Sequence, residues 1–70
     1  MLFTRITIDA AQMGGMPCIR GLRIPVATVV DMVAAGMSAD DILSDFPDLE
    51  RQDIAEALQY ASAALRERQR

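Results

Sequence analysis

The stretch GMPCIRGLRIPV, residues 15–26, holds two glycines, two prolines, two arginines and the only cysteine of the chain. Two short β runs, PCI and LRI, flank Arg20 and Gly21, which is typical of a β-hairpin. Because arginine disfavours a positive φ, we expect a type I turn with Gly21 in the left-handed position of a G1 bulge. Pro25 cannot donate a ladder hydrogen bond, and its fixed φ suits the first turn of a helix. The sequence therefore predicts a hairpin that leads directly into a helix.

A further strand is predicted before this hairpin. Residues 3–8, FTRITI, are rich in β-branched and aromatic side chains, and residues 9–15, DAAQMGG, are typical of a turn and loop. Short strands leave edges that can pair with another chain. We expect the N-terminal strand and hairpin to form a dimer interface or, alternatively, to add a strand to a partner protein. The candidates for these contacts are Ile6, Ile8, Ile19, Leu22 and Arg23.

Two helices are predicted between residues 26 and 47. Valines recur at helical spacing from Val26, and Gly36 is expected to end the first helix as a left-handed residue. Ser38 and Asp41 match a capping box at the start of the second helix. Apolar residues at positions 42, 43 and 46 form its expected buried face, and Pro47 ends it.

A third helix is predicted from about residue 50 to residue 68. Its expected buried stripe, with Ala57 beside it, consists of Ile54, Leu58, Ala61 and Leu65. The predicted fold class is therefore α+β: a short N-terminal strand and β-hairpin followed by a three-helix, helix-turn-helix-like bundle. We expect a single domain over residues 1–70, with the strand and hairpin in residues 1–25 and the helices in residues 26–68.

Length and composition constrain the function. A chain of 70 residues has a thin core, so we expect a homodimer or an obligate partner. Histidine is absent, and neither Ser38 nor Ser44 has a base beside it in sequence. We therefore expect no enzyme activity, no catalytic residue, no metal and no cofactor. The N-terminus does not resemble a signal peptide, and no apolar run is long enough to span a bilayer, so we expect a cytoplasmic protein that does not bind membranes.

Three segments, GGMPCIRGLRIPV, AAGMSADDILSDFPDL and DIAEALQYA, resemble the bacterial family named domain of unknown function 433, over about residues 6–61. The matching positions are Gly15, Pro17, Ile19, Gly21, Arg23, Ile24, Val26, Gly36, Ser38, Ile42, Pro47, Leu49, Asp53, Ile54, Ala57, Leu58, Tyr60 and Ala61. Three positions depart from the family pattern: Leu22 and Glu50 replace the usual threonines, and Phe46 replaces tyrosine. The resemblance implies an antitoxin of a type II toxin–antitoxin system, which neutralises a PIN-like ribonuclease toxin and binds its own operator DNA.

Operator binding requires positive charge for phosphates and polar groups for base edges. The candidates are Arg20 on the hairpin and Arg51, Gln52 and Gln59 on the third helix. Acidic residues lie close to them in the third helix, and the net charge of the chain is −3, which disfavours DNA binding by bulk charge. Residues 1–30 carry three arginines against one acidic residue, whereas residues 31–70 carry nine acidic residues against four arginines. We therefore expect two faces with different partners.

Other interpretations stay open at this point. Arg23 is expected to pair with a carboxylate such as Asp31 or Asp53, and to hold the hairpin against the helices rather than to bind phosphate. The alternative functions are a stand-alone helix-turn-helix transcriptional regulator and a dimeric adaptor for protein interactions that does not bind DNA. The acidic residues of the third helix are consistent with the adaptor, which follows the regulator as the second alternative.

Overall fold

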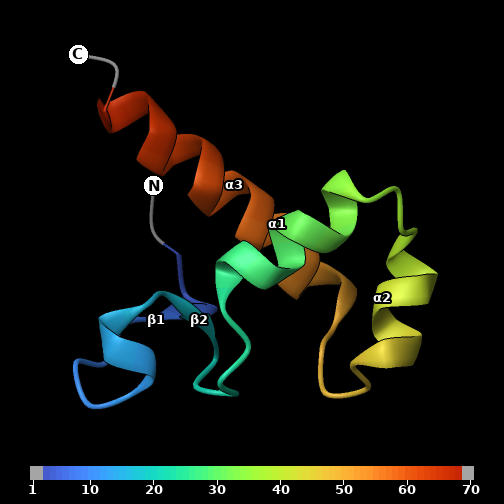
Figure 1. Cartoon of the computed structure of the whole chain (residues 1–70), viewed down its shortest axis with the longest axis horizontal. Helices are drawn as coiled ribbons and strands as arrows, with labels where there is room; N and C mark the ends of the chain where they lie inside the picture. Colours follow the sequence, from blue (N-terminus) through green and yellow to red (C-terminus); the bar gives the residue numbers. More distant parts are fainter. Residues whose placement is uncertain (1–2, 69–70) are drawn as a thin grey trace.

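The computed structural model describes residues 3–68. In chain order its elements are β1 (Ile6–Thr7), the 3₁₀ turn η1 (Met13–Gly15), β2 (Cys18–Ile19), α1 (Val26–Ala34), α2 (Ala39–Asp45) and α3 (Arg51–Arg68). The strands lie at one end of the molecule and α2 at the other, and α1 and α3 cross between them (Figure 1). This arrangement confirms the predicted α+β fold with three helices. None of the helices in residues 3–68 combines the length and the apolar character that a membrane crossing needs.

The two strands form a small antiparallel sheet, in which Ile6 pairs with Ile19 and Thr7 pairs with Cys18. The chain then turns back, and an isolated bridge joins Cys18 to Pro25. The predicted hairpin is therefore present. Its second arm ends at Pro25 because proline has no N–H to continue the ladder.

The hairpin turn differs from the predicted type. The N–H of Leu22 donates to the carbonyl of Ile19 at 2.8 Å, so Arg20 and Gly21 are the two central residues of the turn. Their φ angles are 44° and 71°. A positive φ at both central positions is the geometry of a type I′ turn, so the expected type I turn with a G1 bulge is wrong. An arginine held in this strained conformation requires compensating contacts elsewhere in the structure.

α1 ends as the sequence predicts. Gly36 has a φ of 90°, and its N–H donates to the carbonyl of Val33 at 3.0 Å. The N–H of Met37 donates to the carbonyl of Met32 at 3.1 Å. These two bonds form a Schellman motif, which satisfies the last carbonyls of α1 and turns the chain toward α2.

α2 begins with the predicted capping box. The hydroxyl of Ser38 accepts a hydrogen bond from the N–H of Asp41 at 3.1 Å, and the Asp41 carboxylate accepts one from the N–H of Ser38 at 3.2 Å. The side chain of Ile42 is fully buried, and Leu43 and Phe46 are half-buried against the same core. A cap at one end and an apolar face therefore hold this short helix in place.

Removal of the cap has a defined expected cost. Replacing Ser38 with alanine should lower the free energy of unfolding by about 1 kcal/mol, because the N–H of Asp41 loses its side-chain acceptor. Urea unfolding followed by circular dichroism measures this change. Ser44→Ala is the control, since Ser44 is exposed within the same helix and alanine is the better helix former. An equal loss of stability in both variants would contradict the assignment of the cap.

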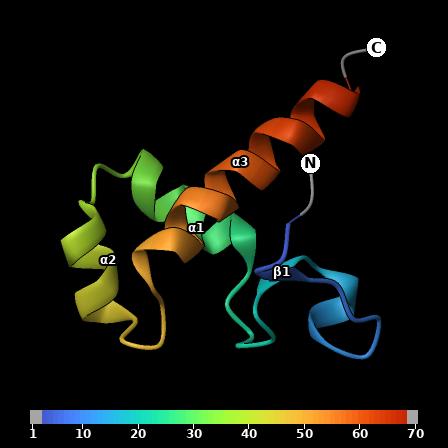
Figure 2. The same cartoon turned by 180° about the vertical axis from the view of Figure 1, so that it is seen from behind.

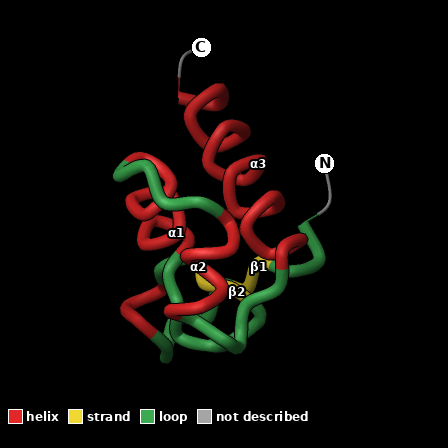
Figure 3. Tube along the Cα trace, turned by 90° about the vertical axis from the view of Figure 1, so that its right-hand side faces the viewer, coloured by secondary structure: helices red, strands yellow, loops and turns green. Residues whose placement is uncertain are grey.

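The core lies between α1, α2 and the first half of α3. Its buried members are Ile19, Val26, Val29, Ile42, Leu49, Ile54 and Ala57. The predicted stripe of α3 is correct for Ile54 but wrong for Leu58 and Leu65, whose exposed fractions are 37% and 61%. For Leu65 the reason is visible in Figure 1, Figure 2 and Figure 3, because the C-terminal half of α3, which contains it, extends beyond the other elements. Leu58 lies about 100° around the helix from the fully buried Ala57, so it faces away from the centre of the core.

Candidate functional site

The side chain of Asp53, in the first turn of α3, is fully buried. Its Oδ2 accepts hydrogen bonds from the N–H of Glu50 at 2.8 Å and from Nη2 of Arg20 at 2.9 Å. Its Oδ1 accepts hydrogen bonds from Nη1 of Arg5 at 2.9 Å and from Nε of Arg20 at 3.1 Å. The bond from Glu50 is one half of a capping box and marks the start of α3. Two guanidinium groups and one main-chain donor therefore compensate the buried charge.

The two arginines connect Asp53 to separate parts of the chain. Nη1 of Arg5, which precedes β1, also donates to Oε1 of Glu50 at 2.6 Å. Nη2 of Arg20 donates to the carbonyl of Asp48 at 2.7 Å, and the N–H of Arg20 donates to the carbonyl of Arg5 at 2.8 Å. These bonds explain how Arg20 keeps its positive φ, because they hold both its main chain and its guanidinium. Arg5, Arg20 and Asp53 are named here the arginine–aspartate cluster.

The cluster keeps its carboxylate charged. Burial by itself would raise the pKa of Asp53, but the hydrogen bonds from Arg20, Arg5 and the N–H of Glu50 outweigh this effect and hold that pKa below its ordinary value. The hydrogen bond with Asp53 also raises the pKa of Arg20. Within residues 3–68, every buried side-chain nitrogen and oxygen has a hydrogen-bond partner. The cluster is therefore satisfied internally and acts as a structural clamp between the N-terminal segment, the hairpin and α3.

The lowered pKa of Asp53 predicts destabilisation by acid. Because this pKa is lower in the folded chain than in the unfolded chain, where it is about 3.9, the stabilisation is present above the unfolded value. It is lost as the pH falls through the folded value. We expect the urea midpoint to decrease between about pH 5 and about pH 3. Asp53→Asn, which does not titrate at this position, should show a smaller decrease over the same range. An equal decrease would assign the acid sensitivity to other carboxylates.

The structure places the four candidate DNA-contacting residues in different surroundings. Arg20 belongs to the arginine–aspartate cluster, and Oε1 of Gln52 accepts a hydrogen bond from Nη2 of Arg5 at 2.5 Å. Arg51 forms an ion pair with Asp40 of α2 in which both side chains are exposed, so solvent and salt weaken the pair. Gln59 is exposed in the middle of α3. Arg51 and Gln59 are therefore accessible, whereas Arg20 is held by a buried carboxylate.

The five candidate partner-contacting residues also divide into two groups. Ile19 is fully buried, and Ile6 and Leu22 are half-buried against the core. Ile8, with 62% of its surface exposed, and Arg23 face solvent. These three residues therefore stabilise the fold: Ile6 and Ile19 pack against the core from the paired strands, and Leu22 does so from the hairpin turn. Ile8 and Arg23 remain accessible to a partner.

The predicted ion pair of Arg23 is wrong. Within residues 3–68, the guanidinium groups that pair with Asp53 belong to Arg5 and Arg20, and Arg23 forms no ion pair with Asp31. The arginine that holds the hairpin against the helices is therefore Arg20 and not Arg23. The turn geometry explains the difference, since it places the side chain of Arg20 on the side of the hairpin that faces α3.

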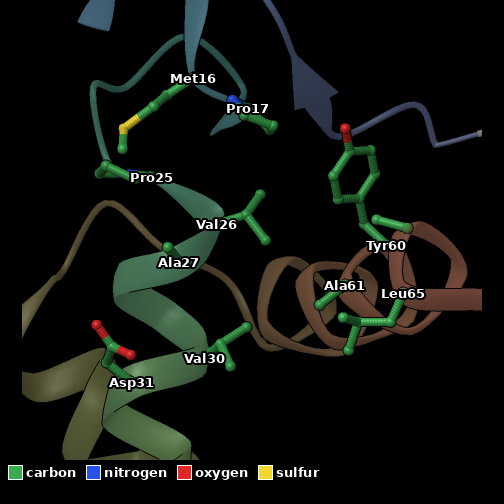
Figure 4. Close-up of a pocket in the computed structure, with 11 residues that line it drawn as sticks. Met16, Pro17, Pro25, Val26, Ala27, Val30, Asp31, Tyr60, Ala61 and Leu65 are labelled. Carbon is green, nitrogen blue, oxygen red and sulfur yellow. The ribbon is translucent and has the colours of Figure 1, made fainter. Parts of the chain in front are cut away.

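A second candidate site is an apolar groove of about 370 Å³ between α1 and the projecting half of α3, named here the α1–α3 groove. Figure 4 shows Val26 and Val30 of α1 pointing toward Ala61 and Leu65 of α3. The carboxylate of Asp31 lies at the margin of the groove that is farther from α3 (Figure 4). An apolar hollow with a charged margin is suited to binding another apolar surface.

The sequence does not predict either site as the structure shows it. From sequence, Asp53 is interpreted only as a partner of Arg23 or as one of the acidic residues of the third helix that disfavour DNA binding. The sequence does contain a signal for the capping role of Asp53. This residue lies three positions after the expected helix start at position 50, and an acidic side chain at that third position can cap the helix. The role of Arg5 carries no such signal. The groove also has none, because the apolar spacing of α3 does not show where its neighbours end.

The fold and much of the sequence are shared with known proteins. A model of the family described as "Protein of unknown function (DUF433)" matches residues 6–61. Uncharacterized protein y4eO from Sinorhizobium fredii (strain NBRC 101917 / NGR234) is 44% identical over 58 residues, which is 83% of this chain and 26% of y4eO. This chain therefore spans about a quarter of the length of that relative.

A solved structure supports the same grouping. The crystal structure of a DUF433 member protein from Anabaena variabilis ATCC 29413 superimposes with a TM-score of 0.82 at 30% sequence identity, over 90% of this chain and 62% of that chain. The fold of this chain is therefore shared with that protein over most of its length. Because the family model also matches most of its length, this chain belongs to the DUF433 family of proteins of unknown function.

Proposed function

We propose that this protein is the antitoxin of a type II toxin–antitoxin system, and that it neutralises a PIN-like ribonuclease by direct protein contact. The family resemblance and one contrast in the structure support the proposal. Polar side chains in the first turn of α3 are bonded within the chain, as Asp53 and Gln52 show. Large apolar side chains are exposed instead, namely Ile8, Met13, Met16, Leu58 and Leu65. This distribution favours a protein partner over DNA as the main ligand.

Contact with the ribonuclease is expected at the N-terminal end of the molecule. Ile8 and Arg23 are the accessible members of the partner candidates, and Met13 is exposed in the turn η1 between them in sequence. Ile8 and Met13 supply apolar area, and Arg23 supplies a positive charge. Methionine and arginine are both enriched at protein–protein interfaces relative to the rest of the surface.

Operator binding is the second part of the proposal, and fewer accessible side chains support it than support the protein contact. α1, α2 and α3 follow one another with short connections, as in a helix-turn-helix unit, and Arg51 and Gln59 are accessible on α3. Release of Arg51 from its exposed pair with Asp40 costs little in salt solution. Arg51→Ala should therefore weaken operator binding and reduce its salt dependence. Ser44→Ala, an uncharged change at an exposed position of α2, is the control and should leave both unchanged.

The main test is affinity purification of this chain from its host, with identification of the co-eluting protein by mass spectrometry and an assay of its ribonuclease activity. We expect a stoichiometric PIN-like partner whose activity is lost at equimolar antitoxin. Ile8→Glu should weaken this complex. Thr4→Glu adds the same charge at a nearby exposed position without removing apolar area, and should leave the complex intact.

The two alternative functions correspond to other outcomes of this test. Retention of promoter DNA without a ribonuclease partner would favour a stand-alone transcriptional regulator. A stable protein complex without ribonuclease inhibition and without DNA binding would favour an adaptor. Either outcome would contradict the antitoxin proposal.

A further inference from the structure

We propose that residues 3–5 form a releasable strap on α3, which opens while the rest of the chain stays folded. While the strap is closed, it occupies the side-chain oxygen of Gln52. The opening is a property of the fold and does not depend on what the protein binds. Its effect on DNA binding rests on the operator binding proposed above.

The strap is attached to α3 mainly through Arg5. The guanidinium group of Arg5 donates hydrogen bonds of 2.6, 2.9 and 2.5 Å to the side chains of Glu50, Asp53 and Gln52. The main-chain N–H of Arg5 donates to Oε1 of Glu56 at 2.8 Å. All these acceptors lie in residues 50–56, at the start of α3. Polar contacts along one segment of α3 therefore hold the strap in place.

Phe3 adds an aromatic contact to the strap but does not join the core. Its ring meets the ring of Tyr60 edge to face, with the two centroids 5.3 Å apart. Of the residues that the structure describes, Ile6 is the first whose side chain packs against the hydrophobic core. Segments with few buried apolar contacts open locally at a lower free energy than the core does. The boundary between the strap and the core therefore falls between Arg5 and Ile6.

The buried charge of Asp53 keeps a partner when the strap opens. Two guanidinium groups share this one carboxylate, and Arg20 by itself donates to both of its oxygens. Arg20 belongs to the hairpin and stays in place, so the opening avoids the large cost of leaving a buried charge unpaired. The side chain of Glu50, which loses its bond to Arg5, is 61% exposed and is hydrated by solvent. Asp53 therefore requires Arg20 in the open form but not Arg5.

Closure of the strap withholds a candidate DNA contact. A glutamine that reads adenine uses its amide oxygen and its amide nitrogen together, and Arg5 occupies this oxygen of Gln52. Opening frees the oxygen, and it also frees the guanidinium of Arg5, which can bind a phosphate as it binds a carboxylate. DNA and the side chains of α3 thus compete for Arg5. The apparent affinity for DNA should fall in proportion to the fraction of molecules that are open.

Native-state hydrogen exchange, followed by NMR at increasing urea below the unfolding transition, tests the opening. The N–H of Arg5 should exchange at a rate that is nearly independent of urea, because release of the strap exposes little surface. The N–H of Arg20 is the matched control, since it donates to the carbonyl of Arg5, on the core side of the boundary. Its exchange should accelerate strongly with urea. Equal urea dependence for the two amides, or an unprotected N–H of Arg5, would overturn the proposal.

Phe3→Ala loosens the strap without changing any charge. It should raise the exchange rate of the N–H of Arg5 by about 2- to 10-fold, the range that corresponds to loss of one aromatic pair, and leave that of Arg20 unchanged. Thr4→Ala, at an exposed position of the same strap, is the control and should change neither rate. Circular dichroism of each variant verifies that it is folded. An unchanged exchange rate at Arg5 in Phe3→Ala would contradict the attachment of the strap through Phe3.

The effect on DNA is measured with a fragment of the protein's own promoter. Phe3→Ala should bind it more tightly than the wild type, by up to the same factor as the change in exchange rate, because more molecules are open. Faster exchange at Arg5 without tighter binding would contradict the role of the strap in withholding Gln52. A wild type that does not bind the fragment at all would contradict operator binding, whereas the exchange rates would still decide whether the strap opens.

Discussion

Replacing Asp53 with alanine is expected to lower the free energy of unfolding by about 3 kcal/mol, the lower end of the cost of removing one partner from a buried ion pair, because Arg5 and Arg20 are partly exposed. The carboxylate is fully buried and accepts bonds from Arg5, Arg20 and the N–H of Glu50. Without it, two guanidinium groups face one another across a void. A chain of 70 residues has a total stability of about 4 to 10 kcal/mol at about 0.05–0.15 kcal/mol per residue. The variant should therefore lose a large share of that stability.

Urea unfolding at neutral pH measures this effect. If Asp53→Ala is unfolded without denaturant, the loss in the free energy of unfolding is measured on Asp53→Asn instead. Asparagine keeps the volume and an acceptor oxygen of aspartate but loses the charge. Its stability should lie between those of the alanine variant and the wild type. Asp45→Ala is the control, since Asp45 is an exposed acid at the C-terminal end of α2, where a negative charge opposes the helix dipole. A loss no larger than that of Asp45→Ala would show that the cluster does not stabilise the fold.

The sequence predicts the parts of this fold that depend on neighbouring residues. The Schellman motif at Gly36 and the capping box of Ser38 each involve groups within five positions of one another. The bond between Arg20 and Asp53 joins residues 33 positions apart, so local patterns contain no information about it. The turn type differs from the prediction for the same reason. The positive φ of Arg20 is stabilised by a distant carboxylate, and rules based on the turn residues alone cannot include that contact.

The candidate sites show a similar division. Selection by residue type identifies Arg20, Arg51 and Gln52 as possible DNA contacts, because arginine and glutamine suit phosphates and base edges. The same side chains also suit carboxylates within the chain. The tertiary structure pairs Arg20 with Asp53 and Arg51 with Asp40. The apolar spacing of α3 correctly identifies a helix. It does not determine how far the covering elements extend, so it predicts a core position for Leu65, which the structure exposes.

Replacing Ile42 with alanine is expected to lower the free energy of unfolding by about 2 to 5 kcal/mol. The side chain is fully buried, and it is the buried residue of a helix of seven residues. A helix this short is not stable by itself in water, so its position depends on packing against the core. Loss of the isoleucine side chain removes that packing and leaves a cavity among Val29, Leu49 and Ile54, members of the same buried cluster.

A graded series separates the role of Ile42 from a general effect of truncating α2. Ile42→Val should cost about 0.5–1.5 kcal/mol, because it removes one methylene group. Leu43→Ala removes a side chain of the same size class from the next position, but that residue is half-buried, so its cost should be smaller than that of Ile42→Ala. Urea unfolding gives the three values. If Leu43→Ala destabilises the protein as much as Ile42→Ala, the half-buried side chain contributes as much packing as the buried one, and the particular role of Ile42 is contradicted.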